Sequence, residues 1–176
     1  MTARAALREA TRAAHERVDA AFGVHDLADR AGYARFLVAQ AAVFGPVEQA
    51  LGDAGAARLI DQWDQWRRAP LLAADLAALD LVDPPSIAAP SYHDDAELAG
   101  GLYVLEGSRF GGAMLRRSVP NGLPMAFLTA SAPPARWAGF IVRLDALLDQ
   151  SQSLNRAIAA ATQTFACFEQ AANEGR

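Results

Sequence analysis

The sequence predicts an all-α fold, a single-domain helical bundle over residues 1–176. Alanine-rich segments carry apolar residues at spacings of three and four, which is the period of an amphipathic helix, while the alternation typical of strands is almost absent. The chain has 176 residues, of which 52% are hydrophobic and 20% charged. This length suits one domain with a buried core and room for one ligand cavity.

The apolar periodicity predicts helices at 3–22, 31–51, 55–67, 70–79, 94–118, 134–150 and 152–174. Gly23 and Gly52 follow the first two of these segments, as expected where a helix ends. Proline-rich segments at 84–90 and 120–134 separate the later ones. Pro46 lies inside the second predicted helix, where it removes a backbone donor and should kink the rod.

Composition excludes several classes of protein. The net charge of −4 argues against general nucleic-acid binding. No apolar run is long enough to cross a bilayer, and the first residues lack a signal-peptide core, so we expect a cytoplasmic protein without a membrane partner. A single cysteine excludes an internal disulfide and a thiolate cluster. Every basic residue is arginine, so guanidinium groups must hold any anionic ligand.

The first predicted helix carries a candidate metal ligand. Residues placed at about 100° intervals put an apolar stripe on one face, with His15 at its edge. Arg8 lies two turns earlier on the same edge, about 10 Å away along the axis. A neutral imidazole there can bind iron, and Arg8 can pair with an anionic group of the same ligand. The alternative is a hydrogen-bonded histidine at the boundary of the core. The predicted stripe comprises Leu7, Thr11, Ala14, Val18 and Phe22.

The segment from 100 to 115 has helical periodicity but carries five glycines, Gly100, Gly101, Gly107, Gly111 and Gly112. Each interior glycine costs a helix about 0.5–1 kcal/mol relative to alanine, so a compensating contact is expected. Three of the five project to nearly the same face, where missing Cβ atoms allow a flat ligand or another helix to reach the backbone. Close helix packing therefore stays open beside ligand binding.

These two segments resemble bacterial biliverdin-producing haem oxygenases. The first matches as Leu7-Arg8-x-x-Thr11-x-x-x-His15-x-x-x-Asp19, and the second as Leu102-Tyr103-Val104-Leu105-Glu106-Gly107-Ser108-Arg109-Phe110-Gly111-Gly112. The likeness extends over most of the chain, including its length and helix order. It implies a haem-oxygenase-like bundle in which haem is sandwiched between the first helix and a kinked, glycine-rich distal helix.

The resemblance also implies roles for individual residues. His15 is the proximal ligand of the haem iron, Thr11 belongs to the same haem-binding motif, and Arg8 lies near a propionate. Tyr103 lies at the propionate edge, and Arg136 and Arg143 are candidates for the second propionate, although both can equally be solvated surface arginines. The predicted catalytic positions on the distal helix are Gly107, Ser108, Gly111 and Gly112, of which Gly107 and Gly111 also contact the haem.

By the same resemblance, haem is both substrate and cofactor. Dioxygen and electrons from an external reductase or ferredoxin convert it to biliverdin, carbon monoxide and ferrous iron. The partners implied are a redox protein and, as a candidate acceptor of the product, a bilin-binding photoreceptor. Animal-type members have an aspartate that orders water for proton delivery where this chain has Ser108, and a hydroxyl supplies no negative charge.

Alternatives to the oxygenase follow from this departure and from the wider fold superfamily. A haem carrier or sensor can keep the slot and lack the proton relay. A carboxylate-bridged di-iron oxidase needs Glu-x-x-His pairs, and the sequence contains none. A thiamine-degrading enzyme needs a cysteine nucleophile in a polar pocket, whereas Cys167 lies between Phe165 and Phe168.

Overall fold

We describe a computed structural model of residues 2–175; Met1 and Arg176, the end residues of the predicted domain, lie outside this range. The described residues form helices and contain no strand, which agrees with the predicted all-α class. In chain order the elements are α1 (Ala3–Phe22), α2 (Arg30–Asp53), η1 (Ala56–Arg58), α3 (Trp63–Trp66), α4 (Ala69–Ala78), α5 (Asp95–Leu115), η2 (Arg116–Ser118), α6 (Ala126–Thr129), α7 (Pro134–Leu147) and α8 (Ser151–Glu174).

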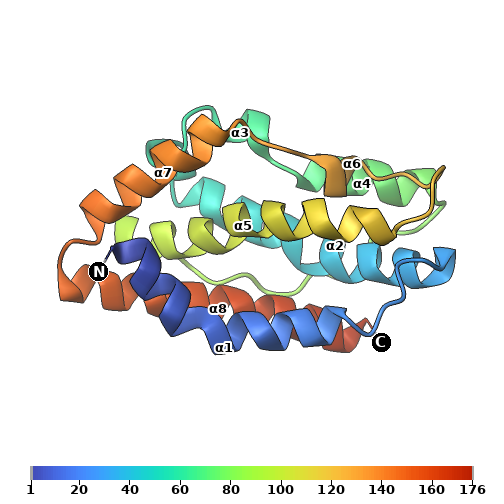
Figure 1. Ribbon diagram of the computed structural model, residues 1–176, viewed down its shortest axis with the longest axis horizontal. Coiled ribbons are helices and arrows are strands. Elements are labelled where there is room, and N and C mark those ends of the chain that lie inside the picture. Colours follow the sequence, from blue (N-terminus) through green and yellow to red (C-terminus); the bar gives the residue numbers. More distant parts are fainter. Residues whose placement is uncertain (1, 176) are drawn as a thin grey trace.

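The C-terminal helix α8 is the element around which the others assemble. It runs beside α1 and packs most extensively against α5, with α2 as its third neighbour (Figure 1). The short helices α4 and α6 pack on one another, and α7 contacts both α1 and α5. Two long helices, α1 and α5, are therefore held by a shared partner. None of the helices formed by residues 2–175 is long and apolar enough to span a membrane.

The first helix confirms the predicted boundaries and its inward stripe. Its N-terminus is capped by Thr2, whose Oγ1 accepts a hydrogen bond from the Ala5 N–H at 3.2 Å. Four of the five stripe residues are buried, and Val18 packs half-buried against the core. The buried four are Leu7, Thr11, Ala14 and Phe22.

The predicted helix over 55–67 is wrong. Gly55 adopts a left-handed φ of 93° and is followed by the single 3-10 turn η1, and Gln62 has a φ of 57°. A residue in this region of φ cannot continue a right-handed helix. The resulting bends bury the side chains of Ile60 and Trp63, so burial of two large apolar residues outweighs helical propensity.

Helix α6 was not predicted, because its cap comes from a distant part of the chain. Both Asp75 carboxylate oxygens accept backbone hydrogen bonds at its start, from the Ala126 N–H at 2.9 Å and the Phe127 N–H at 2.8 Å. Asp75 is buried in α4, so it satisfies two donors that a one-turn helix cannot satisfy alone. No sequence pattern around 126–129 carries this information.

Two of the five glycines of α5, Gly100 and Gly101, lie at close contacts with neighbouring segments. The helix continues without a break through all of them. A Cβ on Gly100 would lie 2.2 Å from the Ala157 carbonyl oxygen of α8, and a Cβ on Gly101 would lie 2.5 Å from the Tyr92 ring. At these two positions the glycines permit close packing, which is the alternative to ligand binding that the sequence left open.

A buried carboxylate, that of Glu48, lies where α2 meets the start of α4. The Glu48 carboxylate is almost fully buried and accepts hydrogen bonds from the backbone N–H groups of Arg68, at 2.6 Å, and Ala69, at 2.9 Å. Burial raises the pKa of Glu48 above its ordinary value, although those two hydrogen bonds and the positive charge of Arg68 oppose the shift. Helix α4 is therefore capped by a carboxylate that costs free energy to keep ionised.

This pKa shift predicts a pH-dependent stability. A carboxyl group with a raised folded-state pKa stabilises the fold fully below its unfolded pKa near 4.5, and that stabilisation is lost as pH rises through the folded-state pKa. We expect Glu48→Gln to remove this contribution. Urea unfolding of both proteins from about pH 4 to pH 8 should then show the wild type losing stability relative to the variant as pH rises. A constant difference across the series would contradict the shift.

Candidate functional site

A cavity of about 620 Å³ lies between α1 and α5, within the size range of ligand pockets. Aromatic residues of α2, α7 and α8 complete its walls. From α1 it is lined by Arg8, Thr11, His15 and neighbouring residues, and from α5 by Tyr103, Gly107, Ser108, Gly111 and Gly112. The structure thus brings together in one cavity every predicted site residue except Arg136 and Arg143.

His15 is oriented by a carboxylate on its own helix. Its Nδ1 lies 3.2 Å from an Asp19 carboxylate oxygen one turn later, and its ring makes an edge contact with Phe165 of α8, with centroids 5.6 Å apart. The side chain is 60% exposed and lines the open cavity. A carboxylate on one ring nitrogen fixes the tautomer and leaves Nε2 available, which is the arrangement typical of a metal-binding histidine.

Opposite α1, the glycines of α5 present bare backbone. A Cβ built on Gly107 or Gly111 would meet nothing within 4 Å. Gly100, on the same face, differs and lies about two turns before Gly107 and about three before Gly111. Gly112 has ordinary contact distances, 3.6 Å to the Leu128 carbonyl oxygen. The face predicted from spacing is therefore divided: α8 covers its beginning, and the cavity lies against the rest.

Ser108 is held from behind by a buried arginine. Its Oγ donates to the Leu105 carbonyl oxygen at 2.6 Å and accepts from Arg68 Nη2 at 2.5 Å. Arg68 is only 3% exposed, and its guanidinium lies 4.6 Å from the centre of the Phe44 ring. Burial is the main cause that lowers the pKa of Arg68 to about 9, so the side chain stays charged at neutral pH. The site thus has a positive charge behind Ser108 where the animal-type pattern has a negative one.

Arginines gather at the α1 edge of the cavity. Arg4 and Arg12 line it together with Arg8. Arg12 is paired with Glu9 and Glu16 on its own helix, whereas Arg8 forms no ion pair with another described residue. An unpaired guanidinium beside an apolar cavity suits a carboxylate of the ligand.

Tyr103 faces the same edge. Burial raises the pKa of its hydroxyl, while the positive charges of Arg4 and Arg8 lower it. Arg4, Arg8 and Tyr103 all line this cavity, so the Tyr103 hydroxyl is a further hydrogen-bonding group at its arginine-rich edge.

Arg136 and Arg143 lie elsewhere, on a second cavity between α7 and the segment 59–66. Arg136 forms an ion pair with Glu106 at 3.2 Å, and Arg143 forms one with Asp61 at 2.8 Å. They are seven residues apart and so share one helical face, but this face of α7 points away from the His15 cavity. The structure therefore does not support their expected contact with the second propionate.

Sequence reasoning missed several residues of the site. Arg68 comes from the start of α4, and its contact with Ser108 joins residues forty positions apart. Trp137, next to Arg136, is the residue of α7 that lines the His15 cavity, and Gln40 reaches it from α2. A signal existed only for Phe165, which lies in an amphipathic helix with a clear apolar face. Among residues 2–175 no cluster of histidine, cysteine and acidic side chains can hold a metal ion by itself.

Comparisons with known proteins identify the family of this chain. Residues 1–174 match the family model described as "Heme oxygenase". A heme oxygenase of Xanthomonas campestris pv. campestris (strain 8004) is 36% identical over 113 residues, which cover 60% of this chain and 67% of that protein.

Solved structures show the same fold. The NO- and CO-bound heme oxygenase of Neisseria meningitidis superposes with a TM-score of 0.76 at 22% identity, covering 99% of this chain and 92% of that one. The heme oxygenase of Leptospira interrogans gives a TM-score of 0.75 at 20% identity, covering 99% and 100%. The all-α haem-oxygenase fold expected from the sequence is confirmed, and the chain belongs to the haem oxygenase family as one of its enzymes.

Proposed function

We propose that the cavity between α1 and α5 binds haem as the substrate, with His15 as the ligand of the iron, and that this enzyme opens the macrocycle to biliverdin, carbon monoxide and ferrous iron. The observation that supports it most strongly is that an imidazole with its Nδ1 on a carboxylate and a stretch of bare helix backbone line the same cavity. Bound haem supplies the oxygen chemistry, and the protein supplies orientation and proton control.

The residues around His15 fit a planar iron-containing ligand. Nitrogen ligands and an apolar surround suit haem iron, and the side chains of Phe165 and Phe168 line the cavity beside the imidazole. Arg8, with Arg4 and Tyr103 beside it, would hold a propionate at the α1 edge. The cavity therefore offers an iron ligand, an apolar wall and an anion-binding edge together.

On the distal side the bare backbone at Gly107 and Gly111 admits a flat ligand closely. It also leaves no side chain there for a reactive oxygen species to oxidise. Arg68 holds the Ser108 hydroxyl in one orientation, so Ser108 positions a water for proton delivery without a distal carboxylate. We propose that this guanidinium-backed hydroxyl does the task that an aspartate does in animal-type members.

The reaction consumes reducing equivalents and releases a linear tetrapyrrole. We propose that a separate reductase or ferredoxin supplies the electrons. A bilin-binding photoreceptor is a candidate acceptor of the product, and iron release is the other use of the reaction.

The test of the proposed function is product analysis after incubation with haem and an electron donor. We expect the wild-type Soret band to decay as biliverdin absorption appears, and we expect His15→Ala to lose both the bound-haem spectrum and the product. His93→Ala is the matched control, because this histidine is exposed in the loop before α5. Haem left unchanged by the wild type, under conditions where a relative turns over, would reject catalysis. A His15-dependent spectrum without product would instead identify a carrier.

Asp19→Asn should weaken the binding of haem iron by His15 without unfolding the chain. An amide accepts the Nδ1 hydrogen bond less strongly, so the imidazole becomes a poorer donor to iron, and we expect haem affinity or turnover to fall by about 10–100-fold. Resonance Raman should show a lower iron–histidine stretching frequency, a readout that a merely structural role would not move. Glu9→Gln is the control, an exposed carboxylate of the same helix outside the cavity. Equal affinity, turnover and frequency in wild type and Asp19→Asn would contradict the role.

A further inference from the structure

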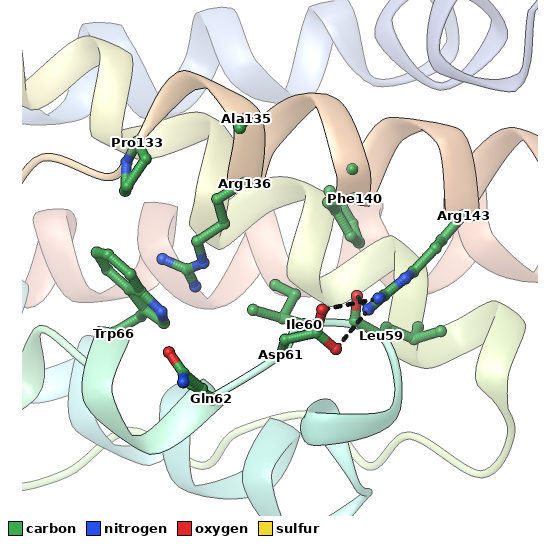
Figure 2. Close-up of a pocket in the computed structure, with 11 residues that line it drawn as sticks. Leu59, Ile60, Asp61, Gln62, Trp66, Pro133, Ala135, Arg136, Phe140 and Arg143 are labelled. Carbon is green, nitrogen blue, oxygen red and sulfur yellow. Dashed lines mark hydrogen bonds and ion pairs between the residues drawn. The ribbon is translucent and has the colours of Figure 1, made fainter.

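A second cavity of about 280 Å³ lies between α7 and the segment 59–66. Figure 2 shows that α7 forms one wall, from which Arg136, Phe140 and Arg143 project, and that Ile60 and Trp66 come from the other. The cavity shares no lining residue with the His15 cavity. It therefore needs an explanation of its own.

Arg136 is the polar centre of this cavity. Its side chain is 10% exposed, its Nη2 donates to a Glu106 carboxylate oxygen at 3.2 Å, and its guanidinium lies 4.5 Å from the centre of the Trp66 ring. Figure 2 shows it reaching from α7 toward Trp66 and Gln62 on the opposite wall. Its Nε and Nη1 are buried without a hydrogen-bond partner among the described residues. Buried donors left in this state are rare in folded proteins unless water or a ligand accepts from them.

The charges around the cavity leave a positive excess. The Glu106 carboxylate is shared by Arg109 and Arg136, and the Asp61 carboxylate is paired with Arg143. Arg136 thus shares its carboxylate with Arg109, which does not line the cavity. Burial is the main cause that lowers the pKa of Arg136 to about 10, so the side chain remains charged at pH 7. A ligand carboxylate in this cavity would therefore meet a charged guanidinium.

The rest of the lining is apolar and the space is small. Ile60 and Phe140 are buried, and Pro133 and the Trp66 ring extend the apolar wall. The volume is just below the range of about 300–1,000 Å³ usual for pockets of drug-sized ligands. A fitting ligand has one anionic group and a compact apolar body.

We propose that this cavity is a binding site for a small organic carboxylate, whose anionic group accepts hydrogen bonds from Arg136 while its apolar body contacts Ile60 and Phe140. The planar guanidinium has a fork of N–H donors that matches a carboxylate. The site is separate from haem chemistry, so it can be tested on the haem-free chain.

The experiment is a calorimetric titration of the full chain with benzoate, which has one carboxylate and a compact ring. Benzamide has the same shape without the charge and is the matched control ligand. We expect benzoate to bind saturably and benzamide to bind at least about tenfold more weakly. The reason is that the benzoate carboxylate accepts hydrogen bonds as a charged group, whereas the benzamide oxygen is neutral.

Two variants assign the binding to this cavity. Arg136→Gln should weaken benzoate binding by at least about tenfold, whereas Arg117→Gln, which changes an exposed arginine of η2, should not. Gly139 lines the cavity, and a Cβ there would meet nothing within 4 Å, so Gly139→Trp should fill the space while Gly139→Ala leaves it open. This second pair leaves every charged group in place and decides the question if Arg136→Gln does not fold.

The proposal is overturned if benzoate shows no saturable binding, if benzamide binds equally well, or if neither Arg136→Gln nor Gly139→Trp weakens the binding. A loss in Gly139→Trp together with full affinity in Gly139→Ala and Arg117→Gln supports it. Thermal unfolding of each variant separates a lost site from a lost fold.

Discussion

Gly100→Ala should destabilise the protein by about 2–3 kcal/mol, because the new Cβ overpacks the contact between α5 and α8. That Cβ would lie 2.2 Å from the Ala157 carbonyl oxygen and 3.0 Å from the Ala157 Cα. Backbone on both sides prevents an easy adjustment, since α8 is also packed against α1. Urea unfolding with an unchanged slope and a lower midpoint is the expected result.

Gly107→Ala is the matched substitution with the opposite outcome. A Cβ at this position meets nothing within 4 Å, so the haem-free chain should gain about 0.5–1 kcal/mol from the better helix former. The same methyl group projects into the cavity, where a displacement of about 1 Å can cost about 100-fold in rate, so haem turnover should fall. If Gly100→Ala and Gly107→Ala were equally stable, it would be wrong that Gly100 serves helix packing while Gly107 leaves room for the substrate.

Arg68→Met should remove about 1–3 kcal/mol of stability, the usual cost of leaving a buried hydrogen-bonding group without its partner. The guanidinium donates to the Leu105 carbonyl oxygen at 2.8 Å as well as to Ser108, and it lies in the field of the Glu106 and Glu48 carboxylates. In the fraction that folds, Ser108 loses the donor that orients it, so we expect slower turnover with haem still bound through His15. The measurements are urea unfolding, haem titration and product formation.

Two further substitutions serve as comparisons for Arg68→Met. Arg68→Lys keeps the positive charge, but its ammonium ends a side chain one atom shorter than the Nη2 that donates to both Leu105 and Ser108, so its stability and turnover should lie between those of Arg68→Met and the wild type. Arg117→Met changes an exposed arginine and should stay within about 0.5 kcal/mol of the wild type. Wild-type turnover in Arg68→Met would show that Ser108 needs no support from behind.

The parts of the site that the sequence predicts correctly lie close together along one helix. Arg8 and His15 are related by helical spacing alone, and so are Gly107 and Gly111. Both pairs line the cavity as expected. Arg136 and Arg143, which the resemblance offered for the second propionate, line the other cavity. Position along a helix carries no information about which neighbour a given face of that helix meets.

Local periodicity and composition were sufficient for the all-α class and for the two long helices that hold the site, because these properties repeat every few residues. The pairing of His15 with the glycine-rich helix was implied by the resemblance to haem oxygenases. Contacts between distant segments were needed for the rest. The left-handed Gln62 serves the burial of Ile60 and Trp63, and Arg68 supports Ser108 from another helix. Such features arise when helices pack, since burial and charge pairing depend on neighbours in space that no short stretch of sequence specifies.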